Sequence, residues 1–293
     1  MSAILVLALL AGAQPSTSTR ERSREAWVIE IPPREVEPGA IRWVGSLDAA
    51  LQEARLRAAP VVVVMGQDTS ETLEYMLATA FLTPTFARAM EECVCLLAMK
   101  GLDHDASEVD GRRICKLFGV SCAEHDRTYS RLHAKLVHRS FWNPLVFVLD
   151  PEGEEILRLE GTGRDVTQIL EEIEYGGKQV AEAHGRALSE RAYRKLLEPV
   201  VRCRELASAG RGRDALAQLD GYGTTRLTSA FRELLVAERQ RVVDDGLSRL
   251  LAAAALAGSD PREALGRLRK IARDYAGTEV EARAQAKIVE LGG

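Results

Sequence analysis

The segment that most constrains the fold is PVVVVM at residues 60–65, which carries four consecutive valines. A proline opens the segment and Gly66 follows it. Four β-branched residues without polar alternation are typical of a strand that is buried on both faces. Strands of this kind lie in the parallel centre of a sheet that helices cover on both sides. The segment therefore predicts an α/β domain.

Helical and strand patterns alternate around this strand. Ser46 is a suitable N-cap for a helix over residues 47–56, where apolar residues recur at helical spacing. Two further apolar strands are expected at 93–100 and 143–150, and the turn at 151–153 leads the second into a hairpin partner. Further helices are expected after residue 70, after Thr83-Pro84, around 112–118 and over 165–175. This order predicts a central sheet between two layers of helices.

The last part of the sequence carries a purely helical pattern. From Lys178 onward no strand pattern is present, and alanine, leucine and arginine recur at helical spacing. Asp260 and Pro261 predict the start of a helix, and Gly277-Thr278 predicts a break before another. This unit of about 33 residues is similar to a tetratricopeptide-type repeat, and residues 214–224 partly echo it. An all-α helical-hairpin domain is expected over 178–293, either as a docking surface or as a buttress for the α/β domain over 41–177.

The charge changes sign between these two parts. The chain has a net charge of −4, which divides into −9 over residues 1–177 and +5 over 178–293. This division indicates two modules of different composition and argues against a nucleic-acid-binding protein, whose basic surface would dominate. Because the net charges are opposite, we expect the modules to pack on each other through a salt-sensitive contact.

Residues 1–13 are predicted to be a signal peptide. Residues 3–13 are uncharged and almost wholly apolar, and they end in the small-residue pattern Ala-Gly-Ala. The run is too short to span a bilayer, which needs about 20 apolar residues, so no integral membrane span is expected in the mature chain. The absence of Lys or Arg before the run leaves a buried N-terminal element as the alternative. Residues 14–40 would form a linker, and the protein would be periplasmic or secreted.

Several segments, in order, resemble a thioredoxin-like domain of the exported bacterial type over residues 41–175. They are Trp43 with SLDAALQEARLRAAP, the valine strand, TPTFARAMEECVCLLAMKGLD, ICKLFGV, and NPLVFVLDPEGEEILRLEG. The resemblance implies a C-x-x-C motif that ends three residues before Met76. That position holds Ser70, Glu71, Thr72 and Leu73, so both cysteines are missing. The resemblance therefore implies the fold with a degenerate active-site turn.

The missing cysteines remove the usual chemistry of that turn. Thiol–disulfide exchange needs a thiolate at a helix N-terminus and a second thiol one turn later. Ser70 and Leu73 supply neither, and no G-x-S-x-G motif supports a serine nucleophile. We expect residues 70–73 to form a structural turn, with Asp68, Thr69 or Ser70 capping the next helix. No catalytic residue is assigned, and enzymatic activity is not expected.

The resemblance also implies a role for Pro144. It matches the proline that is cis in thioredoxins and faces the active-site turn, and Asn143 holds the preceding position. Backbone groups there would pair with an extended peptide, so a groove between Ser70 and Asn143-Pro144 would bind a peptide by strand addition. The alternative is a proline kept only as a turn.

Cysteine and histidine gather in one stretch of the sequence. Four of the five cysteines and four of the five histidines lie between residues 93 and 138. Cys122 and His125 are three apart and would share a helix face, and thiolate with imidazole suits zinc or copper. The alternatives are a Cys115–Cys122 disulfide and purely structural thiols. Cys93, Cys95 and Cys203 are expected to pack in cores, and His104 is expected to be solvated.

Two functions remain open from the sequence. The first is an exported, non-catalytic protein-binding or scaffold protein, with a protein or peptide partner and no cofactor. The alternative is a metal-handling or thiol-active protein that uses Cys115, Cys122 and His125, with zinc or copper as the ion.

Overall fold

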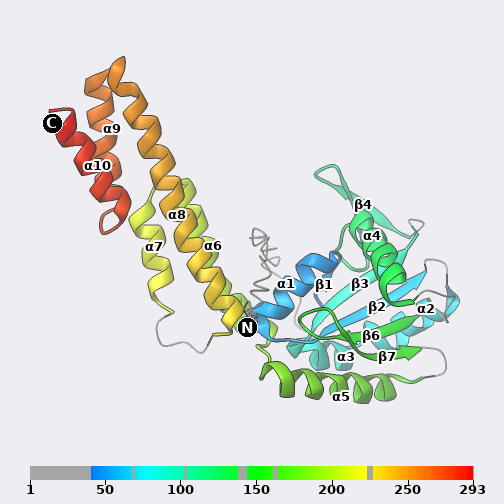
Figure 1. Ribbon diagram of the computed structural model, residues 1–293. Coiled ribbons are helices and arrows are strands. Elements are labelled where there is room, and N and C mark those ends of the chain that lie inside the picture. The colour runs from blue at the N-terminus through cyan, green and yellow to red at the C-terminus, as the bar shows by residue number, and fades with distance from the viewer. Residues whose placement is uncertain are drawn as a thin grey trace, which may run out of the picture.

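The computed structural model describes residues 41–67, 70–101, 104–137, 144–160, 164–222 and 227–292. The predicted signal peptide (1–13) and linker (14–40) lie outside these residues. The described chain has a mixed α/β part followed by an all-helical part that extends away from it (Figure 1). None of the described helices combines the length and the apolar character that crossing a bilayer requires.

The α/β part is built on a five-stranded sheet. Its strands, in the order β1-β3-β2-β6-β7, are β1 (Trp43–Val44), β3 (Val94–Lys100), β2 (Val61–Gln67), β6 (Leu145–Leu149) and β7 (Glu155–Glu160). The valine strand β2 is central, parallel to β3 and antiparallel to β6. The predicted buried central strand is therefore confirmed, and parallel pairing is confined to one of its sides.

Helices cover both faces of this sheet. One face packs against α1 (Leu47–Arg57) and α4 (Cys122–Leu132), which continues into η3 (His133–Val137). The other face packs against α2 (Glu71–Met76), η1 (Leu77–Phe81), α3 (Pro84–Ala89) and α5 (Val166–His184), and η2 (Met90–Glu92) precedes β3. Because successive residues of a strand point to opposite faces, Val61 and Val63 enter one core while Val62 and Val64 enter the other.

The prediction of a helix around residues 112–118 is wrong. The structure instead has a hairpin of β4 (Ala106–Val109) and β5 (Arg112–Cys115). Its turn is Asp110-Gly111, whose φ angles of 50° and 72° are both positive. Asp-Gly is a preferred pair for a two-residue hairpin turn with positive φ at both positions, and this local preference outweighs the short helical pattern.

The C-terminal part consists of helices around a core of its own. They are α6 (Glu190–Ser208), α7 (Gly212–Asp220), α8 (Ser229–Ala255), η4 (Leu256–Gly258), α9 (Pro261–Asp274) and α10 (Glu279–Glu290). The predicted start of α9 is confirmed, because the Asp260 side chain accepts from the backbone N–H of Glu263 at 3.0 Å. Thr278 caps α10, which confirms the predicted break.

The expected domain boundary at residue 177 falls inside α5. This helix lies against β6, where a Cβ on Gly176 would approach the side chain of Val148 to 3.1 Å. The helix continues to His184 and ends at Gly185, which has a φ of 89°. The C-terminal part therefore begins with the end of α5, and α6 (Glu190–Ser208) follows as a separate helix.

A buried ion-pair network joins the two parts. Glu53 accepts from Arg42 and, at 2.8 Å, from Nη1 of Arg57, while Arg42 Nε donates to Glu190 of α6 at 2.9 Å. Arg57 also donates to the backbone carbonyl of Leu188 at 3.0 Å. The side chains of Arg42, Glu53 and Arg57 are 8%, 7% and 1% exposed. The network is therefore shielded from solvent, and salt should screen it only weakly.

The charges at this junction run opposite to the net charges of the two parts. The acidic α/β part contributes Arg42 and Arg57, and the basic helical part contributes Glu190. Burial disfavours ionisation of Glu190, but Arg42 and Arg194 together lower the pKa of its carboxyl. The buried Arg42–Glu190 pair thus opposes the net charges, whereas the exposed Arg186–Glu92 pair, at 3.5 Å, follows them. The salt sensitivity of the contact stays a prediction.

Candidate metal centre

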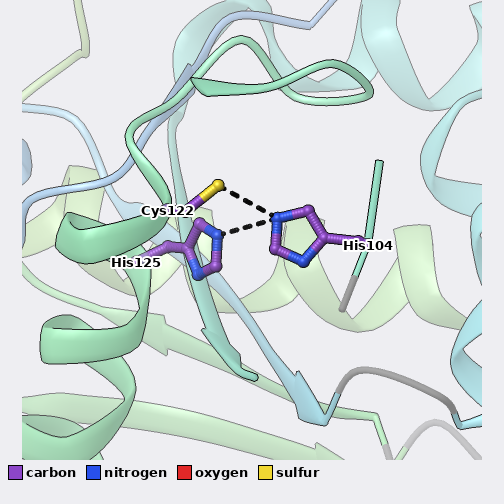
Figure 2. A group of neighbouring side chains, drawn as sticks. All are labelled: His104, Cys122 and His125. Carbon is purple, nitrogen blue, oxygen red and sulfur yellow. Dashed lines mark hydrogen bonds between the residues drawn. The ribbon is translucent and has the colours of Figure 1, made fainter. Parts of the chain in front are cut away.

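Three side chains converge beside the C-terminal end of β3. The ligand atoms of His104, Cys122 and His125 all lie within 4.8 Å of one another. Figure 2 shows Cys122 and His125 extending from α4 toward the ring of His104, which follows β3. His104 Nε2 lies 3.2 Å from Cys122 Sγ and 3.4 Å from His125 Nε2. Two imidazoles and a thiol therefore point at one small volume.

The start of α4 places two of these groups. Cys122 is the first residue of the helix, and the backbone N–H of His125 donates to the carbonyl of Ser121 at 3.1 Å. Residues three apart lie on one helix face, and this face packs on β3, which leaves Cys122 1% and His125 0% exposed. The prediction that these two side chains lie together is confirmed.

A backbone carbonyl fixes the protonation of His125. Its Nδ1 lies 2.9 Å from the carbonyl oxygen of Met99 in β3. A carbonyl only accepts, so Nδ1 carries the hydrogen, and in the neutral ring the lone pair is on Nε2, which faces His104. Histidines that bind metals are held in this way, with one ring nitrogen on the ion and the other donating to a carbonyl or carboxylate.

The distances fit a tetrahedral ion. With zinc bonds of about 2.05 Å to nitrogen and 2.3 Å to sulfur, the nitrogen–nitrogen edge is about 3.3 Å and the sulfur–nitrogen edge about 3.6 Å. The structure has 3.4 Å between the two imidazole nitrogens and 3.2 Å between His104 Nε2 and Cys122 Sγ. These two edges therefore lie within a few tenths of an ångström of a tetrahedral site, and the third edge, between Cys122 and His125, is no longer than 4.8 Å. With three ligands from the described residues, a fourth position is left to another ligand.

A cavity of about 430 Å³ adjoins His104. Its apolar wall comes from α2, η1, β3 and the turn after β5, and it also holds Ser70 and the thiol-bearing Cys115. The lining residues are Ser70, Leu73, Glu74, Leu77, Met99, His104, Asp105, Cys115, Lys116, Leu117 and Phe118. The third side chain of the group thus also forms part of the wall of this cavity.

Cys115 does not belong to the three-residue group. All five cysteines lie within the described residues and none forms a disulfide, so the Cys115–Cys122 disulfide is absent from the structure. Cys115 ends β5, where its backbone N–H donates to Val120 at 2.8 Å, while the sulfur of Cys122 is directed to His104. The expectation of a solvated His104 is wrong, because this residue is half-buried and contacts both other groups.

The turn at residues 70–73 has a structural role. Ser70 caps α2, and its hydroxyl accepts from the backbone N–H of Leu73 at 3.3 Å. Leu73 is buried, whereas Glu71 is exposed and Thr72 is half-buried. Ser70 is therefore the cap among the expected candidates, while Asp68 and Thr69 lie outside the described residues.

The proposed peptide groove is only partly described. Pro144 directly precedes β6, and Asn143 lies outside the described residues. The backbone pairing expected at this position thus stays a prediction.

The other cysteines pack in cores, as expected. Cys93 and Cys95 are on the same face of the sheet, and burial raises the pKa of Cys93 to about 12 and that of Cys95 well above its ordinary value. Burial likewise raises the pKa of Cys203 in α6 to about 11. These thiols stay protonated at neutral pH and are poor nucleophiles or ligands.

Comparison with known proteins adds little at this site. No protein-family model matches the chain, and no curated protein does. A solved structure described as "DsbH Oxidoreductase" matches 50% of this chain and 92% of its own at 13% identity, with a TM-score of 0.34. A likeness at that score says nothing about activity, so function has to follow from the residues themselves.

Proposed function

We propose that this protein binds a soft transition-metal ion, zinc or copper(I), through His104, Cys122 and His125. The observation that carries the proposal is the convergence of three ligand atoms at near-tetrahedral spacing, with His125 held in the ligating tautomer by Met99. Imidazole and thiolate are the donors that these ions prefer.

The number of protein ligands defines the kind of site. Structural zinc sites are closed by four protein ligands, whereas three protein ligands leave a position for water or another molecule. Among the residues that the structure describes, the group has three such ligands, and one of them borders a cavity. The proposed role is therefore handling of the ion, or chemistry at it, rather than stabilisation of the fold alone.

The proposed setting is an exported thioredoxin-like domain that has lost its dithiol. The strand order β1-β3-β2-β6-β7, with β6 antiparallel to its central neighbour, supports the thioredoxin-like assignment. The predicted signal peptide supports export, to the periplasm or outside the cell. In that compartment a buried thiolate would be protected from oxidation by its ion.

Elemental analysis of the purified full chain tests the proposal. After loading with zinc and removal of loose ion, we expect one zinc per chain. Cys122→Ala should lower the affinity by more than the 10–100-fold that loss of a supporting contact costs, because it removes a ligand. Cys203→Ala removes a buried thiol far from the group and should bind zinc as the unmodified chain does.

A second pair of variants tests the imidazole. His125→Gln should weaken zinc binding, whereas His184→Gln, at the end of α5 beside Asp150, should not. Equal zinc affinity in the unmodified chain, Cys122→Ala and His125→Gln would overturn the proposal. Binding should also weaken as the pH falls, because the ion competes with protons for every ligand.

The second candidate is a non-catalytic docking protein. It is favoured by the helical part, which projects from the α/β part and carries a core of its own (Figure 1). The helix-hairpin arrangement is similar to tetratricopeptide-type units, whose stacks bind peptides. Because Ser70 caps α2 and no thiol lies at the start of this helix, the protein should show no activity in an insulin-reduction assay. Appreciable activity would contradict this candidate.

A further inference from the structure

We infer that the fourth position of the proposed metal centre takes a small monoanionic ligand with an apolar body, which lies in the cavity beside His104. This inference rests on the proposed metal site and names the class of molecule that the site would hold. It follows from the shape of the cavity, the residue that it shares with the centre, and the charges around both.

The wall of the cavity is suited to an apolar body. Leu73, Leu77 and Met99 form its inner side and are each less than 8% exposed, while Leu117 and Phe118 close it from the turn after β5. The volume of about 430 Å³ falls within the roughly 300–1,000 Å³ typical of sites for small molecules. Aliphatic chains would therefore lose their water-exposed surface here, which favours binding.

His104 connects the cavity to the centre. Of the three ligands, His104 lines the cavity, while Cys122 and His125 are 1% and 0% exposed beneath it. An ion held by all three would therefore be approached along His104. A molecule whose body fills the cavity would place its head group beside that ring, where the fourth position opens.

The charge of the centre selects the head group. Zinc bound by one thiolate and two neutral imidazoles keeps one positive charge, so the head group follows from the zinc form of the centre. On the cavity wall, Lys116 Nζ lies 3.0 Å from the carboxylate of Asp105, so these two charges offset each other. Glu74 adds one exposed negative charge at the wall. A single negative charge on the ligand neutralises the centre, and a second one would face repulsion from Glu74.

Cobalt(II) provides a readout, because it takes tetrahedral zinc sites and its visible absorption reports its ligands. We would load the full chain with Co²⁺ and titrate it with acetate, butyrate and hexanoate. The expected result is a saturable change in the cobalt spectrum, with affinity rising about fourfold for each methylene that the cavity buries. Hexylammonium has the same body and the opposite charge, and it should leave the spectrum unchanged.

A matched pair of variants locates the ligand. Leu117→Asp places a charge on the cavity wall, and Val109→Asp places the same charge on β4, away from it. Both side chains are about half exposed, at 53% and 51%, so neither change should affect folding. We expect Leu117→Asp to weaken hexanoate binding at least tenfold and Val109→Asp to leave it within twofold. Cobalt should bind both variants at one ion per chain.

The outcomes separate this inference from the proposed function. If Co²⁺ binds in a Cys122-dependent way but the spectrum does not respond to hexanoate, the metal site stands and the ligand inference is overturned. Equal affinities for acetate and hexanoate, or equal effects of the two aspartate variants, overturn it as well. Absence of Co²⁺ binding to the chain would overturn both the proposed metal site and the ligand inference.

Discussion

Replacing Glu53 by glutamine is expected to destabilise the protein more than any single change at its surface. The two carboxylate oxygens of Glu53 accept from different guanidinium groups, Oε1 from Arg57 and Oε2 from Arg42. In Glu53→Gln one oxygen becomes an NH₂ group, which then faces an arginine donor. The change also removes the negative charge that Arg42 and Arg57 share, and of the two only Arg42 keeps a described carboxylate partner, Glu190.

The magnitude follows from the burial of these groups. Removing one partner of a buried ion pair typically costs about 3–5 kcal/mol, because the remaining charge stays desolvated and uncompensated. Arg57 is 1% exposed and cannot reach water without movement of α1 or of the chain at Leu188. At about 2–4 °C per kcal/mol for chains of this size, the midpoint of thermal unfolding should fall by roughly 6–20 °C.

Urea unfolding followed by circular dichroism measures the loss, with Glu152→Gln as the control. Glu152 pairs with Arg55 at 3.9 Å and its side chain is 56% exposed, so removing its charge should change the free energy of unfolding by less than about 0.5 kcal/mol. Since the network is buried, the loss in Glu53→Gln should be nearly independent of salt. A loss below about 1 kcal/mol, or one that disappears at high salt, would refute the reasoning.

Three further predictions concern stability. A Cβ on Gly246 would lie 2.6 Å from the ring of Tyr275, so Gly246→Ala should lower the free energy of unfolding by about 1–3 kcal/mol. Gly266 has open space around it, so Gly266→Ala should stabilise α9 by up to about 1 kcal/mol in the same urea titration. The pKa of Glu190 is lowered in the folded state, so the ionised carboxylate stabilises the fold above the ordinary glutamate pKa of about 4.3. This stabilisation is lost as the pH falls through and below that value. The free energy of unfolding of Glu190→Gln should therefore depend less on pH between 7 and 3 than that of the unmodified chain. The hydroxyl of Thr128, 3% exposed, donates to a backbone carbonyl at 2.7 Å, so Thr128→Val should cost about 1–3 kcal/mol by calorimetry, and a change within experimental error would contradict this.

Much of the fold could be predicted from local patterns. The valine strand, the caps at Ser46 and Asp260, and the pairing of Cys122 with His125 on one helix face all depend on residues within one or two turns of each other. The short helical pattern around 112–118 predicts a helix, whereas the structure forms a hairpin over 106–115 around Asp110-Gly111. The Asp-Gly pair was the local signal that could have found it.

The metal centre could be predicted only in part. His104 is 18 residues before Cys122, and its acidic neighbours suggest solvation. The available signal was its position just after a buried strand, since side chains that follow neighbouring elements meet at the edge of a sheet. Without knowledge of how α4 packs on β3, the spacing of Cys115 and Cys122 predicts a disulfide as readily as the spacing of Cys122 and His125 predicts a metal site.

The sequence by itself determined the four strands β2, β3, β6 and β7, where most helices begin, and that the turn at Ser70 carries no cysteine. These properties arise from backbone preferences, caps and periodic burial, which act over a few residues. The tertiary structure alone decided that His104 joins Cys122 and His125, and that Arg42 of the acidic part pairs with Glu190 of the basic part. Ligand convergence and buried ion pairs depend on how distant elements pack, and net charge or spacing along the chain does not encode that packing.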